Sequence, residues 1–291
     1  MSIKLLLTDT TSPLGQAVFH ELERENIHLL VPSFEECNWS KREATNAYFR
    51  QHHPQIVINT FAFDRLHQSS GPSDFVNASM NLAAASGIAE IPLLHVSSYG
   101  VFSGDTKSAH AEKDIPKPVD ALGQVLAQAE RQIAELAPRH ICLRASWLIG
   151  PYGDNLLTQF LAGFFDGKPI HIQHHAKGAP TTYADFARVL VALAKQISCG
   201  SQNWGVMHYC SPDSCTQEEF FEQLMQLLIQ HQLLQSEPVI AEDTELPEAY
   251  TSAVLTCKLV RDHFGVQGRS WRPSLLPMVK QWLHSREQAN S

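Results

Sequence analysis

The stretch IKLLLTDTTSPLGQAVFHELERENIHLLV, residues 3–31, decides the fold. It opens with an apolar run, Ile3–Leu7, and after a polar turn the apolar residues recur at helical spacing over Leu14–Leu22. A second apolar run, Ile27–Val31, follows at once. Strand, helix and strand in this order predict a βαβ unit with parallel strands and a right-handed crossover.

The same alternation continues as far as Gly150. Nearly continuous apolar strands separated by helices are typical of a parallel sheet that is covered on both faces. We therefore expect an α/β fold in which residues 1–150 form a Rossmann-type, doubly wound, dinucleotide-binding-like domain. Further strands are expected at Ile56–Asn59, Leu93–Ser98 and Ile141–Arg144, and helices near Lys41–His52, Asn81–Ser86 and Ala121–Leu136.

Beyond Gly150 the alternation loosens. Residues 151–291 are expected to form a smaller C-terminal α/β substrate-binding-like region that completes a cleft beside the sheet, with some exchange of chain between the two parts. Helices are expected at Leu156–Phe165, Tyr183–Gln196, Gln217–Leu234 and near Leu275–His284, and short strands near Pro169–Ile172 and Val206–Tyr209.

Composition argues against several classes of partner. The chain carries 30 acidic and 22 basic residues, a formal net charge of −8, without a cluster of Lys and Arg that would neutralise nucleic-acid phosphates or an anionic membrane. No apolar run is long enough to span a bilayer, and the N-terminus lacks the apolar core of a signal peptide. The six cysteines form no C-x-x-C pair. We therefore expect a cytoplasmic protein with reduced structural thiols and no bound metal.

Five segments together resemble the dTDP-4-dehydrorhamnose reductase branch of the extended short-chain dehydrogenases/reductases. They are His53–Asn59, Leu94–Gly104, Leu143–Pro151, Gly178–Thr181 and Trp271-Arg272. The resemblance covers nearly the whole chain and implies a Rossmann domain that binds NAD(P) next to a sugar-nucleotide site. The β subunit of methionine adenosyltransferase, a regulatory offshoot of this family, shares the architecture, so the resemblance does not settle an activity.

The phosphate-binding turn departs from the family pattern T-G-x-x-G-x-L-G, because residues 8–15 read TDTTSPLG. Asp9 and Ser12 replace the glycines that let the backbone approach a diphosphate, and only Gly15 is retained. A carboxylate repels a diphosphate, which weakens the implied NADP or NAD binding. Two other interpretations stay open. Asp9 points away while Ser12 donates to a phosphate, or Asp9 and Ser12-Pro13 cap the first helix.

The resemblance also implies ligand contacts elsewhere. Trp147 would stack on a sugar or base, or else belong to the core, and the sequence favours neither alternative. The cofactor-binding residues that it implies are Thr10, Ser12, Pro13, Leu14, Asn38, Phe61, Ala62 and Ser97. The substrate-binding residues that it implies are Arg144, Trp147, Pro180 and Thr181.

The catalytic helix lacks the family's acid and its cation. Reduction in this family uses a Ser or Thr at a strand end, which Ser98 matches, and a Tyr-x-x-x-Lys pair on the next long helix. In the register set by Pro118 and Gly123, the tyrosine and lysine positions hold Leu122 and Leu126, and no Tyr-x-x-x-Lys occurs anywhere in the chain. A general acid contributes about 10²–10⁴ in rate, so the reductase chemistry is not expected.

The two leucines continue a helical stripe with Ala129 and Ile133. Such a stripe either packs against the sheet and partly fills the former cofactor cavity, or lines a hydrophobic pocket or partner groove.

The leading hypothesis is a catalytically degenerate family member that binds a nucleotide, a nucleotide sugar or a partner protein in a regulatory role. The alternative is an active NAD(P)-dependent oxidoreductase or epimerase on a nucleotide sugar, with Ser98 and either Tyr99 or water as proton source. A third hypothesis is a partner subunit of another enzyme. A homodimer is compatible with each of them.

Overall fold

The computed structural model describes residues 3–63, 66, 71–173, 175–234, 238–241 and 252–289. Its centre is a six-stranded parallel sheet with the order β2-β1-β3-β4-β5-β9. The Rossmann-type, doubly wound α/β fold expected from the sequence is thereby confirmed. The strands are β1 (Lys4–Leu7), β2 (His28–Leu30), β3 (Ile56–Asn59), β4 (Leu93–Ser98), β5 (His140–Ala145) and β9 (Gly205–Tyr209).

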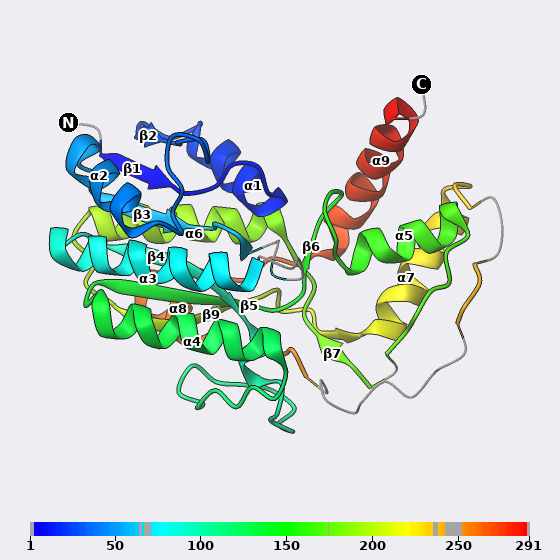
Figure 1. Ribbon diagram of the computed structural model, residues 1–291. Helices are drawn as coiled ribbons and strands as arrows, with labels where there is room; N and C mark the ends of the chain where they lie inside the picture. The colour runs from blue at the N-terminus through cyan, green and yellow to red at the C-terminus, as the bar shows by residue number, and fades with distance from the viewer. Residues whose placement is uncertain are drawn as a thin grey trace.

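Helices cover both faces of this sheet (Figure 1). They are α1 (Pro13–Leu22) and α6 (Tyr183–Ser198) on one face, and α2 (Arg42–His52), α3 (Gly71–Ala89) and α4 (Ala121–Leu136) on the other. Because successive residues of a strand point to opposite faces, Leu5 and Leu7 belong to the core beneath α1 and α6, whereas Leu6 belongs to the core beneath the other three helices.

Both α6 and β9 come from beyond residue 150 and complete the layers that begin at the N-terminus. The chain therefore returns to the central sheet after residue 150, and the division into two parts at that residue stays a prediction.

A second lobe has its own apolar core, which includes Phe160, Phe220 and Trp271. Figure 1 shows its helices grouped beside the carboxyl end of the sheet. Its elements are β6 (Leu148–Ile149), α5 (Leu156–Asp166), β7 (Lys177–Gly178), β8 (Thr181–Thr182), β10 (Cys215–Thr216), α7 (Gln217–Gln230) and α9 (Arg272–Ala289). A short helix, α8 (Lys258–Phe264), precedes α9 and packs next to β9.

One local expectation was wrong, because the strand expected at Pro169–Ile172 is reduced to a single bridge between Ile170 and Ile240. Two expected helices are present but longer. The helix at Asn81–Ser86 is the middle of α3, which begins at Gly71 with proline in its first turn, a position that proline favours. The helix near Leu275–His284 is part of α9, which extends beyond it at both ends.

None of the helices in the described part of the chain is long and apolar enough to cross a membrane.

The sheet has a topological switch point next to β1. From β1 the chain goes first to β2 on one side and later to β3 on the other. In open α/β sheets such a point creates a crevice outside the carboxyl ends of the strands, where ligands bind. The residues that follow β1, β3 and β4 are therefore the first place to look for a site.

Candidate functional site

The turn between β1 and α1 is closed by its own hydrogen bonds. Asp9 Oδ1 accepts from the backbone N–H of Thr11 at 2.8 Å and from the Thr11 hydroxyl at 2.7 Å. Ser12 is the N-cap of α1, with its Oγ accepting from the Gly15 N–H at 3.1 Å, and Pro13 takes the first helical position. Capping of the helix by Ser12-Pro13 is confirmed, whereas Asp9 caps the turn and not the helix.

Close contacts surround this turn. A Cβ placed on Gly15 would lie 2.2 Å from the carbonyl oxygen of Asp9, so only glycine lets the strand end and the helix approach so closely. Asp9 is buried, and its Oδ2 has no hydrogen-bond partner among the residues that the structure describes. From the second lobe, Gly153 lies against the Pro13 ring, where a Cβ would be 2.7 Å from Cγ. A loop of the second lobe thus rests on the N-terminus of α1.

Side chains at the switch point form hydrogen bonds with one another and with the neighbouring backbone. Thr8 Oγ1 donates to Asn59 Oδ1 at 2.9 Å and accepts from the Phe61 N–H at 3.2 Å. Trp39 Nε1 donates to the Thr8 carbonyl at 2.9 Å. The Phe61 ring stacks on that of Phe34, with 6.2 Å between the ring centroids. These groups tie together the ends of β1 and β3 and the segment after β2.

The other implied cofactor positions have structural roles. Leu14 belongs to the core beneath α1, and Asn38 Oδ1 accepts from the Ser40 N–H at 3.0 Å. Ala62 is buried with a φ of 59°, and Thr10 is half-buried in the turn. Within the described chain, none of the eight implied cofactor residues lines the pocket beside Ser98.

That pocket, a cavity of about 500 Å³, opens where β4 ends. The 3₁₀ turn η2 (Tyr99–Phe102) and α4 form one wall, and the second lobe forms the other. Its lining residues are Phe63, Leu66, Ser98, Tyr99, Gly100, Asp120, Leu122, Leu126, Ser146, Trp147, Leu148, Asp154, Asn155, Leu156, Gln159, Gln173, Ala176, Lys177, Tyr183, Gln217 and Ala253.

Ser98 and the two leucines do meet at this pocket. Ser98 is half-buried at the end of β4, and its Oγ accepts from the Gly100 N–H at 3.1 Å. Leu122 is half-buried and Leu126 is 1% exposed, and both line the cavity from α4. The helix face on which the resemblance implies an acid and a cation is therefore apolar here.

The position of α4 against Ser98 depends on glycine and on a cap. A Cβ on Gly123 would lie 2.3 Å from the carbonyl oxygen of Gly100, so the helix and the η2 turn touch through their backbones. Asp120 caps α4, with its Oδ1 accepting from the Gly123 N–H at 2.8 Å. This contact explains why residue 123 is glycine, whereas the register against the family pattern stays a prediction.

The pocket does contain titratable groups from other elements. Burial raises the pKa of Tyr99, and a hydrogen bond with the Trp147 side chain opposes that rise. Lys177 is exposed on β7, and Asp154 lies before α5. A phenol and an ammonium group thus border the cavity, although neither comes from α4.

Arg144 is placed differently from what the resemblance implied. It is 2% exposed, with Nε donating to Glu130 Oε1 at 2.9 Å and Nη2 to Oε2 at 2.6 Å. Its guanidinium also lies 4.9 Å from the Phe102 ring centroid. Ser97 Oγ donates to the same Glu130 Oε1 at 2.6 Å. Arg144 and Ser97 therefore bind α4 to the sheet, and among the described residues neither lines the cavity beside Ser98.

Of the remaining residues that the resemblance implies for the substrate site, one lines the cavity and two do not. Trp147 is 9% exposed, lines the pocket and packs over Gly178, where a Cβ would lie 2.3 Å from the indole ring. Trp147 thus packs in the core and also borders the cavity, and its stacking on a sugar or base stays a prediction. Pro180 and Thr181 are buried outside the lining of this cavity, and Thr181 Oγ1 donates to the Ala179 carbonyl at 3.0 Å.

Sequence reasoning missed the polar groups that the second lobe contributes, namely Asp154, Asn155, Gln159, Gln173, Lys177 and Gln217. They come from four separate segments and follow no motif. The only available signal was the Gly178–Thr181 segment, whose neighbour Lys177 lines the cavity.

Comparison with known proteins places this chain in a family. Residues 3–284 match the model of the RmlD substrate binding domain. A dTDP-4-dehydrorhamnose reductase of Aggregatibacter actinomycetemcomitans is 25% identical over 284 residues, which cover 94% of this chain and 97% of that protein. The methionine adenosyltransferase 2 subunit beta of Rattus norvegicus is 26% identical over 235 residues, 75% of this chain and 70% of that one.

A solved structure has the same fold as this chain. The dTDP-4-dehydrorhamnose reductase of Bacillus anthracis, in complex with NADP, superposes with a TM-score of 0.79, covering 97% of this chain and 99% of that chain at 20% identity. Relatives of this architecture thus include both reductases and a subunit of another enzyme.

Proposed function

The chain belongs to the RmlD substrate binding domain family, and we propose that it is a member that binds a nucleotide or nucleotide sugar beside Ser98 without reducing it. One observation carries this proposal. The face of α4 that borders the cavity presents Leu122 and Leu126, neither of which exchanges a proton or carries charge.

Reduction of a carbonyl needs a proton for the oxygen that receives the electrons. A tyrosine with a lysine one helical turn away supplies it from a single helix face, since residues i and i+4 share that face. Loss of a general acid costs about 10²–10⁴ in rate. Ser98 remains and can donate a hydrogen bond to a ligand oxygen. A serine hydroxyl is suited to binding that oxygen, not to protonating it.

The turn after β1 does not fit the diphosphate of a dinucleotide. Two of its backbone donors are already used, because Asp9 accepts the Thr11 N–H and Ser12 Oγ accepts the Gly15 N–H. Pro13 has no N–H to offer, and the buried Oδ2 of Asp9 adds negative charge where phosphate would lie. We infer that NADP and NAD bind weakly.

The pocket itself suits a polar, partly aromatic ligand. Trp147 offers one face for stacking, and Lys177 offers an ammonium group for a phosphate. Gln159 and Gln217 add amide donors and acceptors in the same cavity. The substrates named for the reductase relatives are nucleotide sugars, which have these features.

Calorimetry with dTDP, a dTDP-linked sugar, NADPH and NADH tests the proposal. We expect heat of binding for dTDP or the dTDP sugar, weak binding of either dinucleotide, and no oxidation of NADPH when a dTDP-4-keto-6-deoxy sugar is added. Tight binding of NADPH together with steady turnover would refute it.

Changing Asp9 and Ser12 to glycine is expected to increase the affinity for NADPH by about tenfold or more, equivalent to about 1.4 kcal/mol, because a repulsive carboxylate is removed. Titration of NADPH fluorescence measures this. Glu90→Gly, which removes an exposed carboxylate far from the turn at a position whose positive φ suits glycine, is the matched control and is expected to change the affinity little. Equal affinities of the D9G/S12G variant and the parent for NADPH would contradict the proposal that this turn weakens dinucleotide binding.

A second candidate, an active NAD(P)-dependent oxidoreductase or epimerase, is favoured by Tyr99 and Lys177 at the same cavity. In that case Tyr99 donates the proton and Ser98 binds the substrate oxygen. Comparing NADPH consumption by the parent with that by Tyr99→Phe and Ser98→Ala separates the two candidates. Turnover that both substitutions abolish would establish the oxidoreductase.

A further inference from the structure

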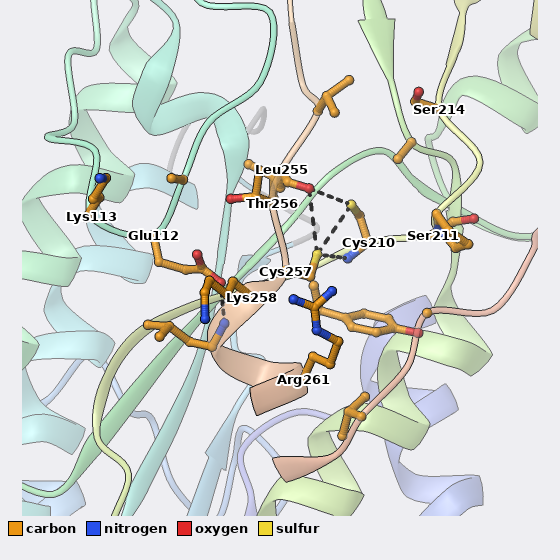
Figure 2. Close-up of a pocket in the computed structure, with 18 residues that line it drawn as sticks. Glu112, Lys113, Cys210, Ser211, Ser214, Leu255, Thr256, Cys257, Lys258 and Arg261 are labelled. Carbon is orange, nitrogen blue, oxygen red and sulfur yellow. Dashed lines mark hydrogen bonds between the residues drawn. The ribbon is translucent and has the colours of Figure 1, made fainter. Parts of the chain in front are cut away.

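A second cavity, of about 830 Å³, lies at the carboxyl end of β9, on residues that the proposed ligand site does not use. Cys210, which directly follows β9, and Cys257, at the N-terminus of α8, both line it. Figure 2 shows the two sulfur atoms side by side in this cavity, next to the carbonyl of Leu255.

The two thiols are in direct contact. The Sγ atoms of Cys210 and Cys257 are 3.6 Å apart, and the Cys210 N–H donates to Cys257 Sγ at 3.2 Å. A disulfide has an S–S separation of about 2.05 Å, so small movements of two side chains bring the sulfurs within bonding distance. Cys257 is half-buried and faces the cavity, whereas Cys210 is 6% exposed behind it.

The surroundings differ from those of the other buried cysteines. Burial raises the pKa of Cys37 to about 12, as expected for a thiol within an apolar core. At the pair, the hydrogen bond between the two thiols lowers the pKa of Cys210 and, together with burial, raises the pKa of Cys257. The first proton therefore leaves Cys210, whose thiolate then lies 3.6 Å from the Cys257 thiol and can accept its proton.

The rim of the cavity is basic, in a chain whose net charge is −8. Lys113, Lys258 and Arg261 line it, and Asp262 pairs with the last two. Glu112 is the acidic residue in the lining, and its Oε1 accepts from the Leu259 N–H at 2.9 Å. An incoming molecule with carboxylates is attracted to such a rim.

We propose that Cys210 and Cys257 form a thiol–disulfide exchange site whose substrate is an anionic, low-molecular-weight disulfide. Cys257, the more exposed thiol, passes its proton to the Cys210 thiolate and attacks one sulfur of R–S–S–R, forming a mixed disulfide and releasing R–S⁻. The Cys210 thiolate then attacks Cys257 Sγ, closing the Cys210–Cys257 disulfide and releasing the second R–S⁻. Two protons go to solvent, the protein pair is oxidised, and the small disulfide is reduced.

Equilibration of the reduced, full-length protein with glutathione buffers of increasing oxidised fraction tests this. After quenching with an alkylating agent, peptide mapping by mass spectrometry is expected to find the Cys210 and Cys257 peptides joined, with the loss of two hydrogen atoms. Cys199, an exposed thiol, is expected to form at most a mixed disulfide with glutathione, and Cys199→Ser is expected to leave the joined pair unchanged.

Cys210→Ser is expected to accumulate a mixed disulfide with glutathione at Cys257, because no second thiol remains to displace it. If Cys210→Ser does not fold, the presence or absence of the joined Cys210–Cys257 peptides in the parent and in Cys199→Ser still tests the proposal. The proposal is overturned if both thiols stay open to alkylation across the whole range of buffers, or if glutathione accumulates at Cys257 in the parent without the joined pair.

Discussion

Glu130→Ala is expected to destabilise the protein by about 3–5 kcal/mol, because it leaves the buried guanidinium of Arg144 without its counter-ion. Arg144 is 2% exposed and Glu130 6% exposed, so water reaches neither charge in the folded state. The neighbouring His208 does not compensate, since burial first and then Arg144 lower its pKa to about 3 and keep it neutral. Thermal or urea unfolding measures the loss.

Two comparisons isolate the cause. Glu135→Ala removes an exposed carboxylate from the same helix and is expected to change stability by less than about 0.5 kcal/mol. The double variant E130L/R144M removes both charges and is expected to regain much of the loss, since replacing a buried ion pair by apolar residues is often neutral. If Glu130→Ala is as stable as the parent, the Arg144–Glu130 ion pair contributes little to stability.

Restoring the catalytic groups is expected to create reductase activity. In a D9G/S12G background, Leu122→Tyr with Leu126→Lys should raise the NADPH-dependent reduction of a dTDP-4-keto-6-deoxy sugar by about 100-fold or more over the same background, because a general acid contributes about 10²–10⁴. Both side chains project into the cavity that Ser98 lines. Initial rates of NADPH oxidation measure the gain.

The matched control is L122F/L126M in the same background, which keeps the volume and supplies neither an acid nor a cation. It is expected to stay at the background rate. If the parent protein already reduces the sugar as fast as the restored variant, its proton donor is a residue outside α4. Tyr99 would then be the first residue to substitute.

The sheet and the apolar face of α4 could be predicted because both rest on local patterns. Apolar runs between helical segments located the strands, and Gly123 fixed the register that puts Leu122 and Leu126 at the cavity. Gly123 was informative for a physical reason, since a larger residue there would collide with the Gly100 carbonyl.

Arg144 could not be placed in the same way. Every residue of β5 is buried, because both faces of that strand are covered, and the partner of Arg144 is a glutamate on a helix. Which helix residue faces which strand residue depends on packing between elements, which periodicity does not reveal. The polar groups of the second lobe were missed for the same reason, since they converge on the cavity only in three dimensions.

The backbone contact between Gly123 and Gly100 has a consequence for recognition. A helix anchored there, and again by the ion pair on its inner face, cannot slide or roll to suit an occupant. We therefore expect the α4 side of the cavity to be preorganised and to need little ordering when a molecule binds. Discrimination between similar molecules would then fall to the opposite side, where Trp147 and Lys177 belong to a lobe with a separate core.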